Sequence, residues 1–392
     1  MIQRRATGPG LLTRWLVLGP GQENHELTTI PQELQDAAQR AARDEAIREF
    51  AEAHLRGENQ DLLQEMLVTI CRLAHDNTDR GSVKLLNKAL AELRYAFKVF
   101  APYEGVRKIS VFGSARTPEG GEDYRTAVEF CQQIKEAGWM VITGAGDGIM
   151  KAGHDGAGAS MSFGVAIHLP FEQRTNTVIA DDEKLVNFRY FFTRKLMFMK
   201  EASAVALFPG GFGTQDEGFE ALTLIQTGKA PLIPIVLVER PGGTYWLQWL
   251  NYVKSELLLA GMIEGDDLNL LFITDSVDAA VQEVVRFYRV YHSMRFVGND
   301  LVLRIQRHLS RETLTRLNDE FGSILTSGRI EQVPALPQEG GEYPDLPRLK
   351  LRFDRRSAGR LRRLVDLVNR EGAHAPAVAG DTTAPSVVDL NP

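Results

Sequence analysis

Between residues 105 and 290 the chain repeats one pattern, in which a short apolar run leads into a glycine-rich turn and then a helical stretch. Nearly continuous apolar runs separated by helices are typical of a parallel sheet that helices cover on both faces. The pattern predicts six strands, at 108–112, 139–143, 163–168, 204–208, 232–238 and 270–274. We therefore expect an α/β fold, a Rossmann-like doubly wound parallel sheet, in which ligands bind beyond the carboxyl ends of the strands.

The segment before this core, residues 1–104, differs in composition. Glycine and proline punctuate its first 30 residues, which we expect to form an irregular arm. Residues 31–100 are rich in Ala, Leu, Glu, Gln and Arg and predict three helices. The run Ala101–Gly105 has the composition of a boundary, so the Rossmann-like domain is expected to span 105–290.

The segment after the core, residues 291–370, predicts a C-terminal helical extension. It offers one or two helices over 301–325, a short strand at 348–353 and a basic amphipathic helix at 357–369. Ala, Pro, Gly and Thr dominate 371–392, which is the composition of a disordered tail. The fold class is thus α/β with helical N-terminal and C-terminal extensions.

Charge and apolar patterning exclude several classes of partner. The net charge is −6, so no overall positive field attracts nucleic acid or an anionic membrane. The arginines of the C-terminal segment lack stacking aromatics and indicate a solvated, salt-bridged helix face. Residues 11–18 are too short for a membrane span and no signal-peptide pattern follows. We expect a cytoplasmic protein with Cys71 and Cys131 as buried thiols.

The segment Phe208–Glu217 follows an apolar strand and opens a helix. Gly210, Gly211 and Gly213 allow close approach to the backbone, and the first N–H groups of a helix have no partner inside it. Together they suit an anion such as phosphate, and the Thr214 hydroxyl can add a donor. A tight turn without a ligand is the alternative, and three glycines directly before a helix favour the phosphate.

Two other glycine turns end neighbouring strands. Gly113 and Ser114 follow the first strand, and Gly144 begins the segment after the second, so we expect base or ribose contacts there. The spacing Gly144-x-Gly146-x-Gly148 is wrong for the dinucleotide fingerprint, and no Walker A loop is present. His154 and His168 show no metal-ligand spacing, and the sequence contains no serine-nucleophile elbow.

Glu217 and the helix expected over 188–200 carry the candidate chemistry. Thr214-x-x-Glu217 also fits a capping box, and from spacing alone capping is the stronger interpretation of Glu217. In the helix, Phe188, Phe191, Phe192, Leu196 and Met199 predict an apolar face, within which Lys195 projects and which Arg194 flanks. Pairing of Lys195 with a phosphate or with Glu217 would offset the cost of that placement, and snorkelling to water is the alternative.

Residues Pro209–Glu217 match PGGxGTxxE in full, and Arg194-Lys195 precede them at the matching distance. In these features the chain resembles the Lonely Guy (LOG) family, once widely labelled lysine decarboxylases. The resemblance implies a phosphoribohydrolase that releases free base and ribose 5-phosphate from AMP or an N6-substituted AMP, such as a cytokinin nucleotide. It places the catalytic positions at Arg194 and Glu217. It places substrate-binding positions at Glu172, Lys195, Gly210, Gly211, Phe212, Gly213, Thr214, Gln215, Asp216 and Thr223.

The chain departs from the family pattern in two ways. The common GGGxxGLMG segment appears here as Gly144–Lys151, and the flanking extensions are absent from short plant-type members. Longer chains of this kind resemble bacterial nucleotide 5′-monophosphate nucleosidases of broader range, which makes AMP the safer substrate. No cofactor is required. A lysine decarboxylase would need pyridoxal phosphate on a Schiff-base lysine, and although Lys195 is available, a parallel Rossmann-like core with this loop is a poor host for that chemistry. The resemblance also implies a homodimer or higher homo-oligomer, and the rival function is a non-catalytic nucleotide sensor with the same phosphate loop.

Overall fold

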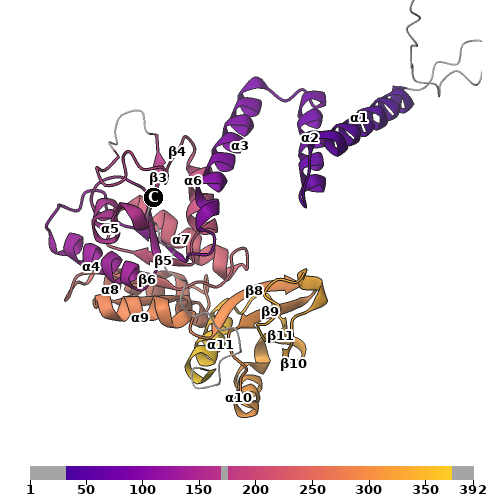
Figure 1. Cartoon of the computed structure of the whole chain (residues 1–392). Coiled ribbons are helices and arrows are strands. Elements are labelled where there is room, and N and C mark those ends of the chain that lie inside the picture. Colours follow the sequence, from indigo (N-terminus) through magenta and orange to yellow (C-terminus); the bar gives the residue numbers. More distant parts are fainter. Residues whose placement is uncertain (1–31, 169–174, 373–392) are drawn as a thin grey trace, which may run out of the picture. The chain divides into compact units, whose positions relative to one another are not determined.

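A computed structural model describes residues 32–168 and 175–372, so the expected N-terminal arm and most of the expected C-terminal tail lie outside the described residues. The chain divides into two compact units, one that ends at Leu85 and one that begins at Leu86. The first unit holds α1 (Gln32–His54), α2 (Gln60–His75) and the start of α3 (Arg80–Phe100). The three helices predicted between 31 and 100 are thus confirmed (Figure 1).

The second unit is built on a seven-stranded sheet in which every neighbouring pair is parallel. Its order is β4-β3-β2-β1-β5-β6-β7. The strands are β1 (Lys108–Phe112), β2 (Met140–Thr143), β3 (Ser162–Ile167), β4 (Leu185–Phe188), β5 (Ala204–Leu207), β6 (Ile235–Val238) and β7 (Leu271–Thr274). All six predicted strands are present and the predicted fold class is confirmed. Strand β4 was not predicted, because Phe188 was assigned to the following helix.

The strand order reverses at β1. From β1 the chain runs outward through β2, β3 and β4, and then returns to place β5 on the other side of β1. In open parallel sheets the loops after the two strands at such a point diverge to opposite faces and leave a crevice. Gly113 follows β1, and Pro209-Gly210 follow β5 closely, so both predicted glycine loops meet at this crevice.

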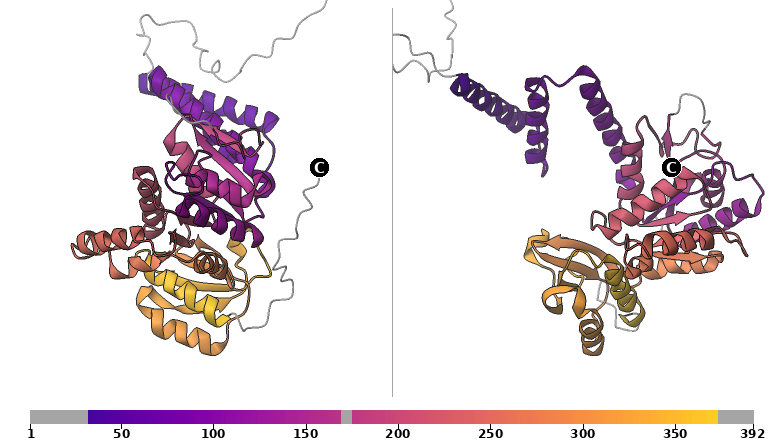
Figure 2. Two further views of the ribbon diagram at one scale, coloured as in Figure 1. Left: turned by 90° about the vertical axis from the view of Figure 1, so that its left-hand side faces the viewer. Right: turned by 180° about the vertical axis from the view of Figure 1, so that it is seen from behind.

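Side chains of successive strand residues alternate between two buried clusters, as the period of a strand requires. Ile109 and Val111 pack beneath α4 (Glu122–Glu136), α5 (Ile149–Ala157) and α9 (Val277–Phe287). Phe112 packs on the other face, in the cluster that holds the end of α3 and the buried sides of α6 (Phe191–Lys200), α7 (Phe212–Gln226) and α8 (Tyr245–Tyr252). Both helical layers are visible in Figures 1 and 2.

The C-terminal extension holds a second sheet that the sequence did not predict. The sheet is antiparallel, with the order β10-β11-β9-β8. Its strands are β8 (Tyr291–Val297), β9 (Asp300–Ile305), β10 (Leu325–Val333) and β11 (Arg348–Phe353). Helix was expected over 301–325, but only α10 (Arg311–Phe321) and a 3-10 turn at Gly322–Ile324 form there. Gly298, at φ +60°, begins the two-residue turn that joins β8 to β9.

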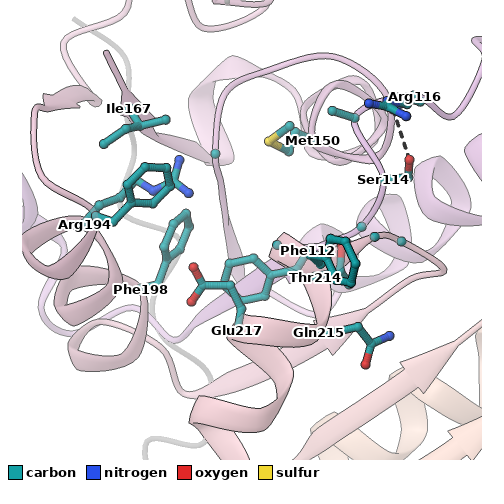
Figure 3. Close-up of a pocket in the computed structure, with 18 residues that line it drawn as sticks. Phe112, Ser114, Arg116, Met150, Ile167, Arg194, Phe198, Thr214, Gln215 and Glu217 are labelled. Carbon is teal, nitrogen blue, oxygen red and sulfur yellow. Dashed lines mark hydrogen bonds between the residues drawn. The ribbon is translucent and has the colours of Figure 1, made fainter. Parts of the chain in front are cut away.

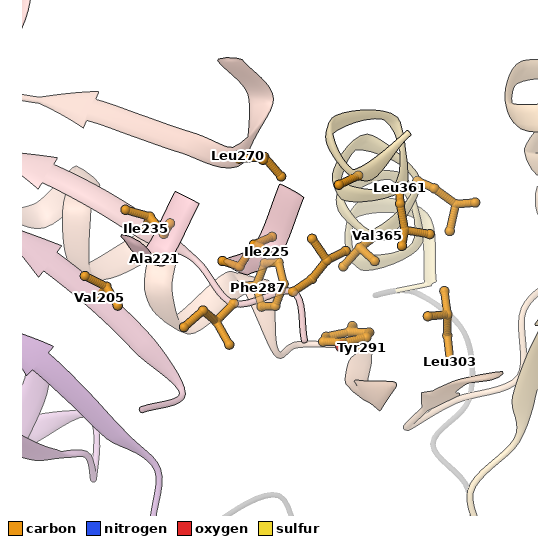
Figure 4. Close-up of a cluster of buried hydrophobic side chains, with 14 of the residues drawn as sticks. Val205, Ala221, Ile225, Ile235, Leu270, Phe287, Tyr291, Leu303, Leu361 and Val365 are labelled. Atoms are coloured by element: carbon orange, nitrogen blue, oxygen red, sulfur yellow. The ribbon is translucent and has the colours of Figure 1, made fainter. Parts of the chain in front are cut away.

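The predicted strand at 348–353 and the predicted basic helix are both confirmed, the helix as α11 (Ala358–Glu371). Helix α11 closes the space between the two sheets. Leu361 and Val365 join one buried cluster with Phe287, Tyr291 and Leu303 (Figure 4).

The salt-bridged character predicted for the C-terminal arginines is confirmed for four of the six, Arg352, Arg360, Arg362 and Arg363. Arg352 pairs with Asp300, and Arg360 and Arg363 each lie within 4 Å of an Asp266 carboxylate oxygen. Arg362 departs from the predicted solvated face, because it is buried and pairs with Glu283 and Asp366. Cys131 is buried as expected, whereas Cys71 is only half-buried. No helix among the described residues is long and apolar enough to cross a membrane.

Candidate active site

A cavity of about 760 Å³ opens at the carboxyl ends of β1 and β5. It gathers eleven of the residues that the sequence singled out: Gly113, Ser114, Gly144, Arg194, Gly210, Gly211, Phe212, Gly213, Thr214, Gln215 and Glu217. Figure 3 shows Arg194 and Phe198 on one side of this cavity and Ser114 and Arg116 on the other. The three glycine loops thus surround one space, as the strand order requires.

Three predicted site residues that the structure describes, Lys195, Asp216 and Thr223, do not line the cavity. Lys195 and Asp216 form an ion pair beside it, with 2.9 Å between Lys195 Nζ and Asp216 Oδ2. Thr223 lies further along α7, where it lines a separate cavity of about 90 Å³. Glu172 lies outside the described residues.

The loop after β5 leaves the start of α7 open to a ligand. Gly211 is the N-cap and no side chain caps the helix. The first helical bond runs from the Gln215 amide to the Gly211 carbonyl at 3.1 Å, so the amides of residues 212–214 precede it. A Cβ added at Gly211 or Gly213 would meet no atom within 4 Å. A helix start that no side chain caps, next to glycines with open space around them, has the geometry of an anion site.

The same loop is held firmly on its inner side. A Cβ at Gly210 would lie 2.1 Å from Thr214 Oγ1 and 3.0 Å from the Ser114 amide, so only glycine fits there. The Ser114 amide donates to the Pro209 carbonyl at 3.1 Å, which ties the loop after β1 to the loop after β5. Tyr245 Oη donates to the Gly210 carbonyl at 2.5 Å. The fold therefore holds this loop in one conformation.

Arg194 enters the cavity from α6 with an incompletely satisfied guanidinium. Its centre lies 5.1 Å from the Phe191 ring and 5.6 Å from the Phe198 ring. Its Nε is buried without a hydrogen-bond partner. Burial lowers the pKa of Arg194, and the nearby Glu217 carboxylate opposes that shift. A buried donor without a partner is costly, and a bound ligand can satisfy it.

The capping prediction for Glu217 is wrong. Because the N-cap is Gly211, Thr214 lies inside α7 and makes no capping bond, so Glu217 has no cap to complete. The Glu217 residue is 6% exposed, and its carboxylate points into the cavity toward the side of Arg194 (Figure 3). Burial raises the pKa of Glu217, while Lys195 and Arg194 pull it down. A partly desolvated carboxylate thus faces the space where a ligand would lie.

Lys195 lies between three carboxylates of α7. Its Nζ is 3.6 Å from Glu217 Oε2 and 2.9 Å from Asp216 Oδ2, and it also pairs with Glu220. Burial alone would lower the pKa of Lys195, but Asp216, Glu220 and Glu217 together raise it. The predicted pairing of Lys195 with Glu217 is therefore present and joins α6 to the catalytic candidate.

The predicted apolar face of this helix is wrong. The residues that are buried in α6 are Thr193, Met197 and Phe198. Phe191, Phe192 and Leu196 are each about half exposed. The helix begins three residues later than expected, because Phe188 belongs to β4.

Several cavity residues were missed by the sequence interpretation. An apolar wall is formed by Phe112, Met150, Ile167, Phe191 and Phe198. Such a wall suits a planar base, since it offers aromatic and thioether contacts. Arg116 also lines the cavity, and it forms no ion pair with any of the described residues. Arg116 follows Gly113-Ser114-Ala115 directly at the end of a strand, and this position in the sequence could have predicted its place in the cavity.

The histidine near the cavity is structural. His154 is fully buried and lies 3.0 Å from Thr143 Oγ1 through its Nε2 and 3.2 Å from Asn176 Oδ1 through its Nδ1. Burial lowers the pKa of His154. Within 32–168 and 175–372 no group of His, Cys, Asp and Glu is arranged to hold a metal ion.

Residues 145–284 match the family described as possible lysine decarboxylase, which confirms the resemblance to the LOG family for that segment. No curated protein matches the chain. The match covers β3–β7 and includes Arg194, the glycine loop and Glu217.

Similar solved structures cover the same part of the chain. The molybdenum cofactor binding protein of Rippkaea orientalis is 18% identical, with 45% of this chain and 93% of that one covered and a TM-score of 0.32. The molybdenum cofactor carrier protein of Chlamydomonas reinhardtii is 20% identical, with 46% and 97% covered and a TM-score of 0.32. DNA processing protein A of Helicobacter pylori is 10% identical, with 46% and 80% covered and a TM-score of 0.32. These scores are too low to support an argument about function.

Proposed function

We propose that this chain, which matches the LOG family over residues 145–284, hydrolyses the N-glycosidic bond of purine nucleoside 5′-monophosphates. The products would be free base and ribose 5-phosphate, with AMP as the reference substrate. The family match supports a nucleotide-related, hydrolase-like role at the level of the family. The proposal of nucleotide hydrolysis depends on one observation. The uncapped start of α7 and the buried carboxylate of Glu217 line the same cavity.

The chemistry follows from what each group faces. Cleavage of an N-glycoside passes through a sugar with oxocarbenium character. Glu217 is the only acidic side chain that lines the cavity among the described residues, so it would stabilise that cation or activate water at C1′. The amides of residues 212–214 would hold the 5′-phosphate, and this remote binding energy would fix the position of C1′.

Arg194 and the apolar wall would act on the base. The guanidinium has an unsatisfied Nε and lies beside the Phe191 and Phe198 rings. A planar base against this wall would place its ring nitrogens within reach of the Arg194 donors. Charge-assisted donation to the departing base would lower the barrier to its release.

Decarboxylation of lysine fits the site poorly. That reaction would draw on pyridoxal phosphate held as a Schiff base by a lysine, which must first lose its proton. Lys195 is the lysine nearest the cavity that the sequence singled out, and three carboxylates surround it and raise its pKa. An ammonium held in this way is a weak nucleophile.

Incubation of the purified full-length chain with AMP tests the proposal. Chromatography should detect adenine and ribose 5-phosphate in equal amounts, and a panel of nucleoside monophosphates should rank the bases. Binding of nucleotides without release of any base would instead favour a non-catalytic sensor that uses the same loop.

We further propose that the working form is at least a homodimer. Phe191, Phe192 and Leu196 on α6 and Phe212 at the start of α7 are exposed, with Phe212 at 95%. Exposed apolar side chains of this kind can pack against a second copy of the chain about a two-fold axis. Light scattering at working concentration tests this, since a fully active monomer would contradict it.

A further inference from the structure

Glu92 on α3 is a buried carboxylate that binds the start of α6. The residue is 5% exposed. Its Oε1 accepts from the Arg189 amide at 2.9 Å, and its Oε2 accepts from Thr193 Oγ1 at 2.9 Å. Both of its oxygens are thus used on the segment that enters the helix carrying Arg194.

Burial of the Glu92 carboxylate costs free energy unless hydrogen bonds or a cation stabilise its charge. The cation that pairs with Glu92, Lys88, is half-exposed and lies 4.0 Å away. The N-cap of α6 is Tyr190, whose side chain makes no capping bond. Glu92 therefore supplies, from another helix, the negative charge that a helix start favours.

The contact with Thr193 also sets the rotation of α6. Successive residues of a helix are about 100° apart around its axis. When Thr193 is fixed toward Glu92, Arg194 turns toward the cavity and Lys195 turns toward the α7 carboxylates, as observed. Loss of the Glu92 contact would free the helix start and with it the direction of both cations.

We propose that Glu92 is a positioning residue for Arg194, acting through Thr193 and the start of α6. This inference rests on the proposed hydrolysis and extends it, because it makes the N-terminal helix α3 a part of the active-site scaffold. The Rossmann-like domain expected over 105–290 does not include Glu92, which lies on α3 before β1.

The test compares Glu92→Ala with Phe100→Leu. Phe100 is also a buried residue of α3, where it stacks on Phe163 at 4.2 Å, and it does not line the cavity. The control therefore measures what a destabilised α3 does by itself. With AMP, Glu92→Ala should lower kcat by about tenfold or more while KM changes less, as expected when a catalytic group is misplaced. Phe100→Leu should leave kcat within about twofold.

A second readout does not depend on catalysis. Hydrogen exchange over residues 189–200 should be faster in Glu92→Ala than in Phe100→Leu, because only the former loses the helix-start bonds. Thr193→Val should reproduce the Glu92→Ala effects, Thr193→Ser should retain the wild-type behaviour, and Glu92→Ala with Thr193→Val should be no worse than either alone.

Equal exchange rates over 189–200 in the two α3 variants, or an unchanged kcat in Glu92→Ala, would overturn the proposal. If the wild-type chain released no base from any nucleotide, the proposed function would fail. The exchange comparison would still decide whether Glu92 fixes α6.

Discussion

Lys195 Nζ lies 3.6 Å from Glu217 Oε2, although the two residues come from different helices, α6 and α7. Burial and the Lys195 ammonium act on the pKa of Glu217 in opposite directions. Burial favours the neutral acid at Glu217, whereas the ammonium of Lys195 favours the carboxylate. The result is a Glu217 pKa above its usual range, in a residue that the proposed chemistry needs in the charged form.

Glu217→Gln should lower the turnover of AMP strongly. The amide keeps the shape of the side chain but carries no negative charge to stabilise a sugar cation or to activate water. We expect a fall in kcat of about 100- to 10,000-fold, the range of general acid–base contributions. Steady-state kinetics measures kcat, and calorimetry should find nucleotide affinity within about threefold of wild type. Near-wild-type activity would remove Glu217 from the mechanism.

The same variant should be more stable than the wild type at neutral pH. A carboxyl with a raised pKa in the folded state contributes stability at low pH and loses it as the pH rises through that pKa. Glutamine mimics the protonated form at every pH, and Lys195 keeps Asp216 and Glu220 as partners. Thermal unfolding should show a higher Tm for Glu217→Gln at pH 7 to 8, and the difference should vanish below about pH 4. A lower Tm at pH 7 would contradict this account.

Lys195→Met should shift the pH dependence of catalysis. Removal of the ammonium leaves burial less opposed, so the pKa of Glu217 should rise further. If the charged form of Glu217 is active, the acidic limb of the kcat/KM profile moves to higher pH. Lys200→Met is the matched control, because Lys200 lies on the same helix and pairs with Glu201 at the surface. An unshifted acidic limb in Lys195→Met would argue against Glu217 as the titrating group.

The sequence was sufficient for most of the parallel core because its five central strands, β3, β2, β1, β5 and β6, are buried on both faces. Ile109 and Phe112 pack into opposite clusters, so both positions must be apolar, and the run is visible without a structure. The glycine loop was equally visible, since Gly210 has no room for a side chain and Gly211 and Gly213 face open space.

The incorrect predictions concern segments in which contacts distant in the sequence, and not the local residue pattern, decide which side chains are buried. Leu196 fits an apolar helix stripe but is half exposed, while Thr193 is buried because Glu92 binds it. That carboxylate lies 101 residues earlier in the chain, so no local window could show the contact. The strands β8 and β9 were missed because Gly298 was not recognised as a hairpin turn.

Glu339→Gln should destabilise the C-terminal sheet strongly. Glu339 is 2% exposed, and its two oxygens accept from Arg304 Nε and Arg348 Nε at 2.8 Å each. Loss of the charge leaves the fully buried Arg348 without its counter-ion, which costs about 3–5 kcal/mol. Glu342→Gln is the control, since Glu342 pairs with Arg304 from an exposed position and should cost about 0–1 kcal/mol. Denaturant unfolding at pH 7 compares the two variants, and equal losses would contradict the prediction.

The pH dependence of this effect has the opposite sign to that of Glu217. Burial alone would raise the pKa of Glu339, but Arg348, the Leu336 amide and Arg304 hold it at about 2. A depressed pKa contributes stability above the unfolded value and loses it as the pH falls. The gap between wild type and Glu339→Gln should therefore narrow between about pH 4 and pH 2.

The 5′-phosphate should be essential, so AMP should be cleaved far faster than adenosine. No side chain caps the start of α7, and open space surrounds Gly211 and Gly213 there; hydrogen bonds from its amides to a charged group would contribute about 1.5–3 kcal/mol each. Two such bonds correspond to about 100- to 10,000-fold in kcat/KM. Because this energy also places C1′ against Glu217, kcat should fall as well as affinity. Gly211→Asp should mimic the loss without unfolding the chain, since a Cβ there meets no atom within 4 Å. Gly105→Asp adds the same charge at an equally open position that does not line the cavity, and it should leave AMP cleavage unchanged.

Steady-state kinetics on AMP and adenosine tests this prediction. Comparable kcat/KM values for the two substrates would mean that the loop does not bind the phosphate.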